Sequence, residues 1–217
     1  MLVVIGIPVG RTGRHDGGLY GTPALASVAA SRAGARVELV GKAGEDPAGD
    51  AAVLALGQQD VGHAALLRAP GHPTPRLIDA ALDDDSIRPD ETDEPAPPAF
   101  EPADRADWPV LEPEDVQLAL RYVQDVRAII VAEPMPDAVV RTVIEGAAYL
   151  AAPVVVVVAD ARTTPAADIV LVSPPADPDG AFAEVLGQLG AALDRGISPE
   201  EAFAELRTRL GVTSTTA

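Results

Sequence analysis

Residues 34–50 read Gly-Ala-Arg-Val-Glu-Leu-Val-Gly-Lys-Ala-Gly-Glu-Asp-Pro-Ala-Gly-Asp, an order that predicts a helix end, a strand and a turn. Gly34 can close a preceding helix, because glycine adopts the left-handed backbone conformation without a Cβ clash. The apolar residues of 37–40 are typical of a short buried strand. Gly41 and Gly44 leave the backbone free to change direction, so we expect a tight turn there.

A new helix is predicted to begin directly after this turn. Asp46 can accept hydrogen bonds from the unpaired amides of a first helical turn, and Pro47 suits the first helical position, where no N–H is needed. The stretch is therefore a helix–strand–helix joint, which is the building unit of α/β proteins.

Strand and helix patterns alternate along the rest of the chain. Five consecutive valines at 154–158 are typical of a strand buried on both faces, as in a parallel sheet. Other strands are expected at 2–6, 36–40, 64–68, 76–82 (an edge strand), 127–132 and 169–172. Helices are expected at 22–34, 47–59, 112–123, 136–150 and 179–194 and from 198 onward, and residues 8–20 are expected to form a Gly-rich connection. The predicted fold class is α/β with a mostly parallel sheet.

The composition limits the compartment and the partners. Of the 217 residues, 47% are hydrophobic and 23% charged, which is typical of a globular protein with a real core. The net charge of -17 argues against nucleic acid and anionic membranes as partners, because both would be repelled. No long apolar run or signal-type segment is visible, so we expect a cytoplasmic protein. The absence of cysteine excludes disulfides and thiolate metal sites.

The stretch from about residue 83 to 110 differs from its surroundings. It is rich in acidic residues and proline, and only Phe100 and Trp108 could bury much area. Such a segment is predicted to be a flexible loop within a single α/β domain spanning 1–217. The two aromatic side chains could either anchor a partner or fold back onto the body of the protein.

Residues 33–49 follow the pattern Leu-Gly-Ala-x-Val-x-Leu-Val-Gly-x-Val-Gly-x-Asp-x-x-Gly almost position for position. This pattern belongs to the ribokinase or PfkB family of sugar and nucleoside kinases, which the chain resembles. Weaker matches follow at 60–75, 111–115, 167–170 and 181–202. The resemblance implies a ribokinase-like three-layer sandwich that carries a lid.

The segment that resembles the family's catalytic signature is altered. In the family, the aspartate of Gly-Ala-Gly-Asp is the catalytic base, and the glycine amides before it stabilise the transferred phosphoryl group. Aligned on Ala181-Phe182, this chain reads Asp177-Pro178-Asp179-Gly180. Gly180 therefore stands at the base position, without a side chain to accept a proton. Asp177 and Asp179 add negative charge where phosphate would dock, and Asp179 is the alternative candidate for a base, shifted by one residue.

The resemblance also implies that much of the nucleotide-binding part is missing. Residues 172–175 run into the altered signature almost at once, and Pro and Ala replace the Asn and Glu of the family's Pro-Asn-Glu motif. We therefore expect no cofactor. ATP and Mg²⁺ are expected as cofactors only if the chain is an active kinase with a rearranged or partner-completed site.

Residues that bind the sugar in the family are also replaced in this chain. Arg11 falls near the position of a family aspartate, and Leu25 falls on a family asparagine. Gly21 aligns with one of two family glycines, and Glu133 aligns with a glutamate close to the substrate. Gly21 and Glu133 are thus the candidate substrate-binding residues. No catalytic residue is assigned.

Metal binding is not predicted either. His63 and His72 have neither the mutual spacing nor the carboxylate partners of a metal site. The acidic run 83–85 lacks the spaced ligands and turn glycine of a calcium loop.

Three functional hypotheses remain open from the sequence. The first is a shortened, catalytically inactive kinase relative, a pseudokinase, that binds a small molecule or acts as a regulatory or structural partner, with a homodimer formed through lid strands. The second is an active ATP-dependent sugar or nucleoside kinase with a rearranged or partner-completed site. The third is an unrelated α/β binding protein that shares only the joint at 34–50.

Overall fold

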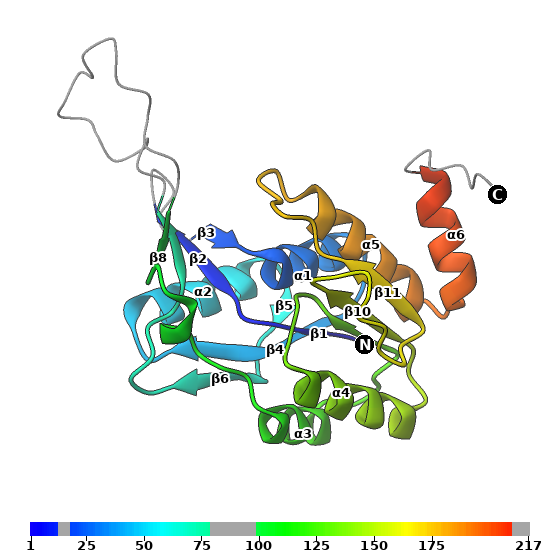
Figure 1. Cartoon of the computed structure of the whole chain (residues 1–217), viewed down its shortest axis with the longest axis horizontal. Coiled ribbons are helices and arrows are strands. Elements are labelled where there is room, and N and C mark those ends of the chain that lie inside the picture. Colours follow the sequence, from blue (N-terminus) through cyan, green and yellow to red (C-terminus); the bar gives the residue numbers. More distant parts are fainter. Residues whose placement is uncertain (13–17, 79–98, 210–217) are drawn as a thin grey trace, which may run out of the picture.

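Residues 1–12, 18–78 and 99–209 are described in the computed structural model, and a parallel β-sheet lies at their centre (Figure 1). In spatial order its strands are β11 (Ile169–Val172), β10 (Val154–Val158), β9 (Ala128–Val131), β1 (Leu2–Ile5), β4 (Val37–Gly44) and β5 (Val61–Gly62). A further strand, β6 (Leu66–Ala69), pairs in parallel with the second half of β4. The mostly parallel sheet predicted from the sequence is confirmed.

Burial explains why the strands at the centre are continuous apolar runs. Every residue of β1, β9 and β10 is buried, including all five valines of β10. A strand covered by helices on both faces must be apolar at each position, because side chains alternate between the faces. The bounds of β10 and β11 are those expected from the sequence.

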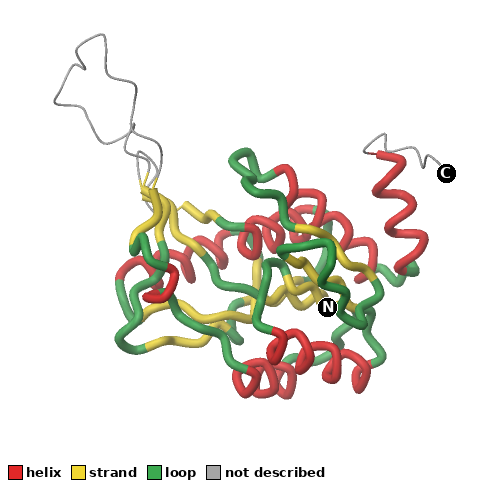
Figure 2. The backbone as a smooth tube through the Cα atoms, viewed as in Figure 1, coloured by secondary structure: helices red, strands yellow, loops and turns green. Residues whose placement is uncertain are grey.

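Two layers of helices cover the sheet (Figures 1 and 2). One face packs against helices α1 (Thr22–Arg32), α2 (Pro47–Gln58) and α5 (Ala181–Asp194), and α6 (Pro199–Arg209) packs against α5. The opposite face packs against α3 (Pro113–Tyr122) and α4 (Asp137–Leu150). Alternate residues of β1 serve the two cores: Leu2 and Val4 enter the first, and Val3 and Ile5 enter the second.

A second, smaller sheet lies at one end of the sandwich, where strands β2 and β8 meet in Figure 1. Its order is β3 (Gly18–Tyr20), β2 (Val9–Thr12), β7 (Arg76–Ile78) and β8 (Ala99–Glu101), with one parallel and two antiparallel pairings. Two expectations are corrected here. The Gly-rich connection expected at 8–20 contains two strands, and the strand expected at an edge, β7, lies between β2 and β8.

The described part of the segment expected to be a loop at 83–110 is also ordered differently. It contains β8 and a 3-10 helix, η2 (Arg105–Asp107). Trp108 is 7% exposed, its Nε1–H donates to the Pro102 carbonyl at 3.0 Å, and its ring lies 5.6 Å from that of Phe100. Trp108 therefore folds back onto the body of the protein. Residues 83–98 lie outside the described residues.

The joint at 34–50 forms largely as expected. Gly34 has a φ of +87° at the end of α1, as the helix-closing role requires, and Asp46 caps α2. The tight turn at Gly41 and Gly44 was a wrong prediction, because β4 continues through both residues. A Cβ on Gly41 would overlap the carbonyl oxygen of Gly6, and one on Gly44 would overlap that of His72. Glycine is needed here for close backbone approach rather than for turning.

In the part of the chain that the structure describes, no helix has both the length and the apolar character needed to cross a membrane.

Candidate functional site

The carboxyl ends of β1 and β9 mark the place where this sheet would be expected to bind a ligand. These neighbouring strands pair in register, Leu2–Ile5 against Ala128–Val131. The chain after β1 leads to α1 on one face, whereas the chain after β9 leads to α4 on the other. Open α/β sheets bind ligands at such a divergence.

Glu133 occupies this position, directly after β9. Its Oε1 accepts a hydrogen bond from the Ile7 N–H at 2.6 Å, so it connects the two diverging segments. Burial raises the pKa of Glu133 to about 7, although the Ile7 N–H and the positive charge of Arg105 act in the opposite direction. A carboxyl with such a pKa can donate or accept a proton near neutral pH.

Gly21, the other candidate substrate residue, stands at the start of α1. It is the N-cap of α1, with a φ of +81°. A Cβ on Gly6 would overlap the ring of Pro23, two residues after Gly21, and would lie 3.1 Å from Glu133 Oε1. The structure therefore places Gly21 and Glu133 in one neighbourhood, and Arg11 lies in β2 of the second sheet.

The amino end of α5 is filled by a carboxylate of the chain itself. Asp177 accepts hydrogen bonds from the Phe182 N–H and the Ala183 N–H, each at 3.0 Å. The first amides of a helix form a natural anion site, because they lack intrahelical partners and lie at the positive end of the helix dipole. In this chain, an internal anion occupies that site.

Gly180 and Leu25, the positions of two altered family residues, face each other. Gly180 is the N-cap of α5 with a φ of +69°, and a Cβ there would lie 3.3 Å from Leu25 Cδ1. An apolar side chain thus lies beside Gly180, the position at which the resemblance implies a base. Asp179 is exposed and lines a cavity of about 360 Å³ together with Leu25 and Arg32.

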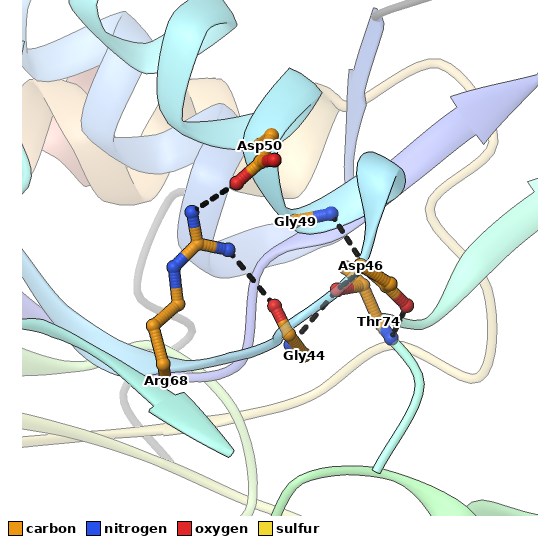
Figure 3. Close-up of polar contacts among 6 residues, drawn as sticks. All are labelled: Gly44, Asp46, Gly49, Asp50, Arg68 and Thr74. Carbon is orange, nitrogen blue, oxygen red and sulfur yellow. Dashed lines mark hydrogen bonds and ion pairs between the residues drawn. The ribbon is translucent and has the colours of Figure 1, made fainter. Parts of the chain in front are cut away.

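A polar cluster joins β4 and α2 to the chain entering the second sheet (Figure 3). Asp46 Oδ1 accepts from the Gly49 N–H at 2.8 Å and from the Thr74 hydroxyl at 2.6 Å, and Oδ2 accepts from the Thr74 N–H at 2.7 Å. Burial raises the pKa of Asp46, but the hydrogen bonds from Thr74 and Gly49 outweigh burial, and the net pKa is lowered. Asp46 is therefore held ionised as a structural link.

Arg68 extends this cluster on the side of β6. Its guanidinium donates to the Gly44 carbonyl at 2.8 Å and pairs with Asp50 at 2.5 Å (Figure 3). Thr74, which is 2% exposed, also accepts from the Gly44 N–H at 2.8 Å. Sequence analysis found the cap at Asp46 but missed Thr74, because no local pattern ties residues 28 positions apart.

The histidines considered for metal binding serve other roles. His63 Nδ1 lies 3.2 Å from the Val61 carbonyl oxygen, and His72 Nδ1 lies 3.2 Å from that of Asp107. Within residues 1–12, 18–78 and 99–209, no three metal-binding side chains are grouped as a site would require. The acidic run 83–85 lies outside these ranges.

Comparison with known proteins gives a fold but no sequence relative. No family model and no curated protein matches the sequence. Among solved structures, the chain is similar to the ribokinase of Arabidopsis thaliana complexed with ribose and ATP, with a TM-score of 0.61, 15% identity, and coverage of 100% of this chain and 93% of that one. A PfkB protein from Polaromonas sp. JS666 gives a TM-score of 0.61 with 12% identity, covering 98% of this chain and 96% of that one.

A fructokinase with bound ATP from Xylella fastidiosa gives a TM-score of 0.51 with 14% identity, covering 95% of this chain but 65% of that one. The similarity thus extends over almost the whole chain, which disfavours the hypothesis of a resemblance confined to residues 34–50. The chain therefore has a ribokinase/PfkB-like fold.

Proposed function

We propose that this chain is a cytoplasmic carbohydrate-kinase-like protein that does not transfer phosphoryl groups, and that it binds a small molecule or acts as a regulatory or structural partner. The observation that carries the proposal is the Asp177 carboxylate at the amino end of α5, 3.0 Å from each of two amide nitrogens. The resemblance to ribokinases implies that a phosphoryl group would be stabilised at this helix end.

Two physical arguments support the loss of catalysis. Phosphoryl transfer depends on positioning and on stabilising negative charge, and a carboxylate at the anion site opposes both. A general base must reach the proton that it abstracts, and Gly180 offers no side chain while Leu25 approaches it with a methyl group.

The proposed ligand site is the neighbourhood of Glu133 and Gly21. A carboxyl with a pKa of about 7 can form hydrogen bonds as donor and as acceptor, which suits a small hydroxyl-rich molecule. The second sheet would cover such a ligand, and a homodimer through its strands belongs to the same proposal.

The test is ADP formation by the purified chain with Mg²⁺ and ATP against a panel of pentoses, hexoses and nucleosides. We expect no turnover above the background without protein, for the wild type and for Asp179→Asn alike. Sugar-dependent turnover that Asp179→Asn abolishes would refute the proposal and would identify Asp179 as the base.

The position of Asp179 favours one alternative function, an active sugar or nucleoside kinase with a rearranged site. Asp179 is exposed and lines the cavity of about 360 Å³ described above, next to Arg32, which could hold an anion. This alternative requires ATP binding, which raises the melting temperature because a ligand that binds only the folded state stabilises that state by RT ln(1 + [L]/Kd). An unchanged melting temperature at about 5 mM MgATP, some five times a 1 mM Kd, would contradict it.

A further inference from the structure

Charged and apolar side chains not considered so far line one cavity at the amino ends of the strands of the main sheet. A cavity of about 650 Å³ lies at the amino ends of β1 and β4, between these strands, the segment from β5 to β6, and the end of α3. Small-molecule sites typically have volumes of about 300–1,000 Å³. The cavity is at the opposite strand ends from Glu133, and the inference drawn from it does not depend on the proposed function.

Two opposite charges line one wall of this cavity. Arg36 and Glu38 lie two positions apart along the chain at the start of β4, so their side chains project from the same face of the sheet. Glu38 is 9% exposed, and its Oε1 accepts from the Ala65 N–H at 2.9 Å. Among the residues that the structure describes, neither Arg36 nor Glu38 has an ion-pair partner.

The Glu38 carboxylate can form further interactions in this arrangement. A carboxylate that is largely withdrawn from water is stable only when hydrogen bonds or a cation compensate for the lost hydration. Glu38 Oε2 receives no hydrogen bond from the described part of the chain, yet it is not sealed from the cavity. Glu38 can therefore accept a hydrogen bond from a cationic group in the cavity.

The facing wall is apolar. Leu118 and Tyr122 lie one turn apart on α3, and 44% and 78% of their respective areas are exposed. Leu67 adds apolar surface from β6. The wall therefore offers apolar area, and an apolar group that covered it would gain free energy by removing that area from water.

The other charged groups around the cavity do not neutralise Arg36 or Glu38. The Met1 ammonium pairs with Asp194 at 2.9 Å and donates to the Asp125 carbonyl, so it is already engaged. Asp60 adds a second carboxylate to the lining. Of the lining cations in the described residues, Arg36 alone lacks a partner, so an anionic group would bind there.

We propose that this cavity is a binding site for a zwitterion with an apolar side chain, namely an apolar α-amino acid. Its ammonium group binds Glu38 Oε2, its carboxylate binds the guanidinium of Arg36, and its side chain lies against Leu118 and Tyr122. The Cα atoms of residues two apart in a strand are about 6.6 Å apart, and the long arginine side chain spans this distance to reach a carboxylate adjacent to the bound ammonium.

The test is calorimetric titration of the full chain with L-phenylalanine, 3-phenylpropionate and 2-phenylethylamine. We expect saturable binding of L-phenylalanine with a Kd of about 1 mM or tighter, and binding at least about tenfold weaker for the compounds lacking either charge. No saturable heat with L-phenylalanine at about 10 mM, ten times that Kd, would overturn the proposal, and so would equal binding of all three compounds.

Variants locate the site. Glu38→Gln keeps the acceptor for the Ala65 N–H and removes the charge, and Arg36→Gln alters an exposed residue, so both are expected to fold. Each should weaken L-phenylalanine binding by about tenfold or more. Arg141→Gln on α4, an exposed arginine away from the cavity lining, is the matched control and should bind as the wild type does. Unchanged binding in Glu38→Gln and Arg36→Gln would overturn the proposal.

Discussion

Replacing Asp46 by alanine should destabilise the protein strongly, because Asp46 links the first turn of α2 to Thr74. The substitution removes three hydrogen bonds, one from the Gly49 N–H and two from Thr74, whose side chain is 2% exposed. Loss of a helix cap costs about 1 kcal/mol. Leaving the buried Thr74 donors unpaired costs about 1–3 kcal/mol more. We expect a loss of about 3 kcal/mol in the free energy of unfolding.

Equilibrium unfolding in urea, followed by circular dichroism, measures this loss. For a domain of this size, about 3 kcal/mol corresponds to a fall of about 6–12 °C in melting temperature. The matched control is Asp50→Ala, four residues later on the same helix. Asp50 is 76% exposed and pairs with Arg68 at the surface, so its loss should cost no more than about 1 kcal/mol. If Asp46→Ala were no more damaging than Asp50→Ala, the role of the cluster would be refuted.

The same cluster predicts a pH dependence. The pKa of Asp46 is lowered from 3.8 in the folded protein, so the unfolded state binds the proton more readily. The stabilisation by Asp46 is therefore complete above the unfolded pKa and is lost as the pH falls through the folded pKa. The stability gap between the wild type and Asp46→Ala should narrow below about pH 4. A gap that widens toward acid pH would contradict this sign.

Three further predictions test separate parts of the structure. Lys42 pairs with Asp115 at 2.6 Å, and both side chains are 16% exposed. Lys42→Met should therefore lower the free energy of unfolding in urea by about 1–2 kcal/mol. A double-mutant cycle with Asp115→Asn should show that the two side chains stabilise each other. The pKa of Glu133 is about 7 in the folded protein and 4.5 in the unfolded chain, so the folded state holds this proton more tightly. The free energy of unfolding should therefore fall by about 3 kcal/mol as the pH rises from 4.5 to 7. Glu133→Gln should remove that slope in unfolding curves taken at several pH values; a slope that persists would show that other groups cause it. Gly180→Ala should lower the free energy of unfolding by about 1–2 kcal/mol, because Gly180 has a positive φ and a Cβ there would lie close to a side chain. The control Gly34→Ala should lose less, because Gly34 has a positive φ but open space around it. Equal losses in the two variants would exclude a contribution from the side-chain contact.

Elements with a strong local signal could be predicted from the sequence. Five valines after a proline suffice for a buried parallel strand, and Asp46 before Pro47 suffices for a helix start, because both depend on a few neighbouring residues. Strands β2 and β3 were missed because each has three or four residues, includes glycine, and gains its order from pairing with distant segments. Local sequence does not encode that pairing.

The same distinction applies to the candidate site. The proposed loss of the base could be inferred from Gly180 in the sequence, since a glycine has no side chain in any fold. The hydrogen bonds that Asp177 accepts from amides of α5 had a weak signal, an acidic residue shortly before a helix start. The contact between Gly180 and Leu25 joins segments about 155 residues apart, so only the packing of α5 against α1 reveals it. The alternation of Arg36 and Glu38 within the strand predicted at 36–40 is a local signal that places both charged side chains on one face of the sheet.

The most direct test of the central claim is the binding of MgATP to the wild-type chain, measured by calorimetry without sugar. If the Asp177 carboxylate takes the place of a phosphate at the amino end of α5, ATP should show no saturable binding up to about 5 mM. Saturable binding of MgATP with a Kd well below about 1 mM would contradict the account, if competitors for the phosphate site abolish that binding.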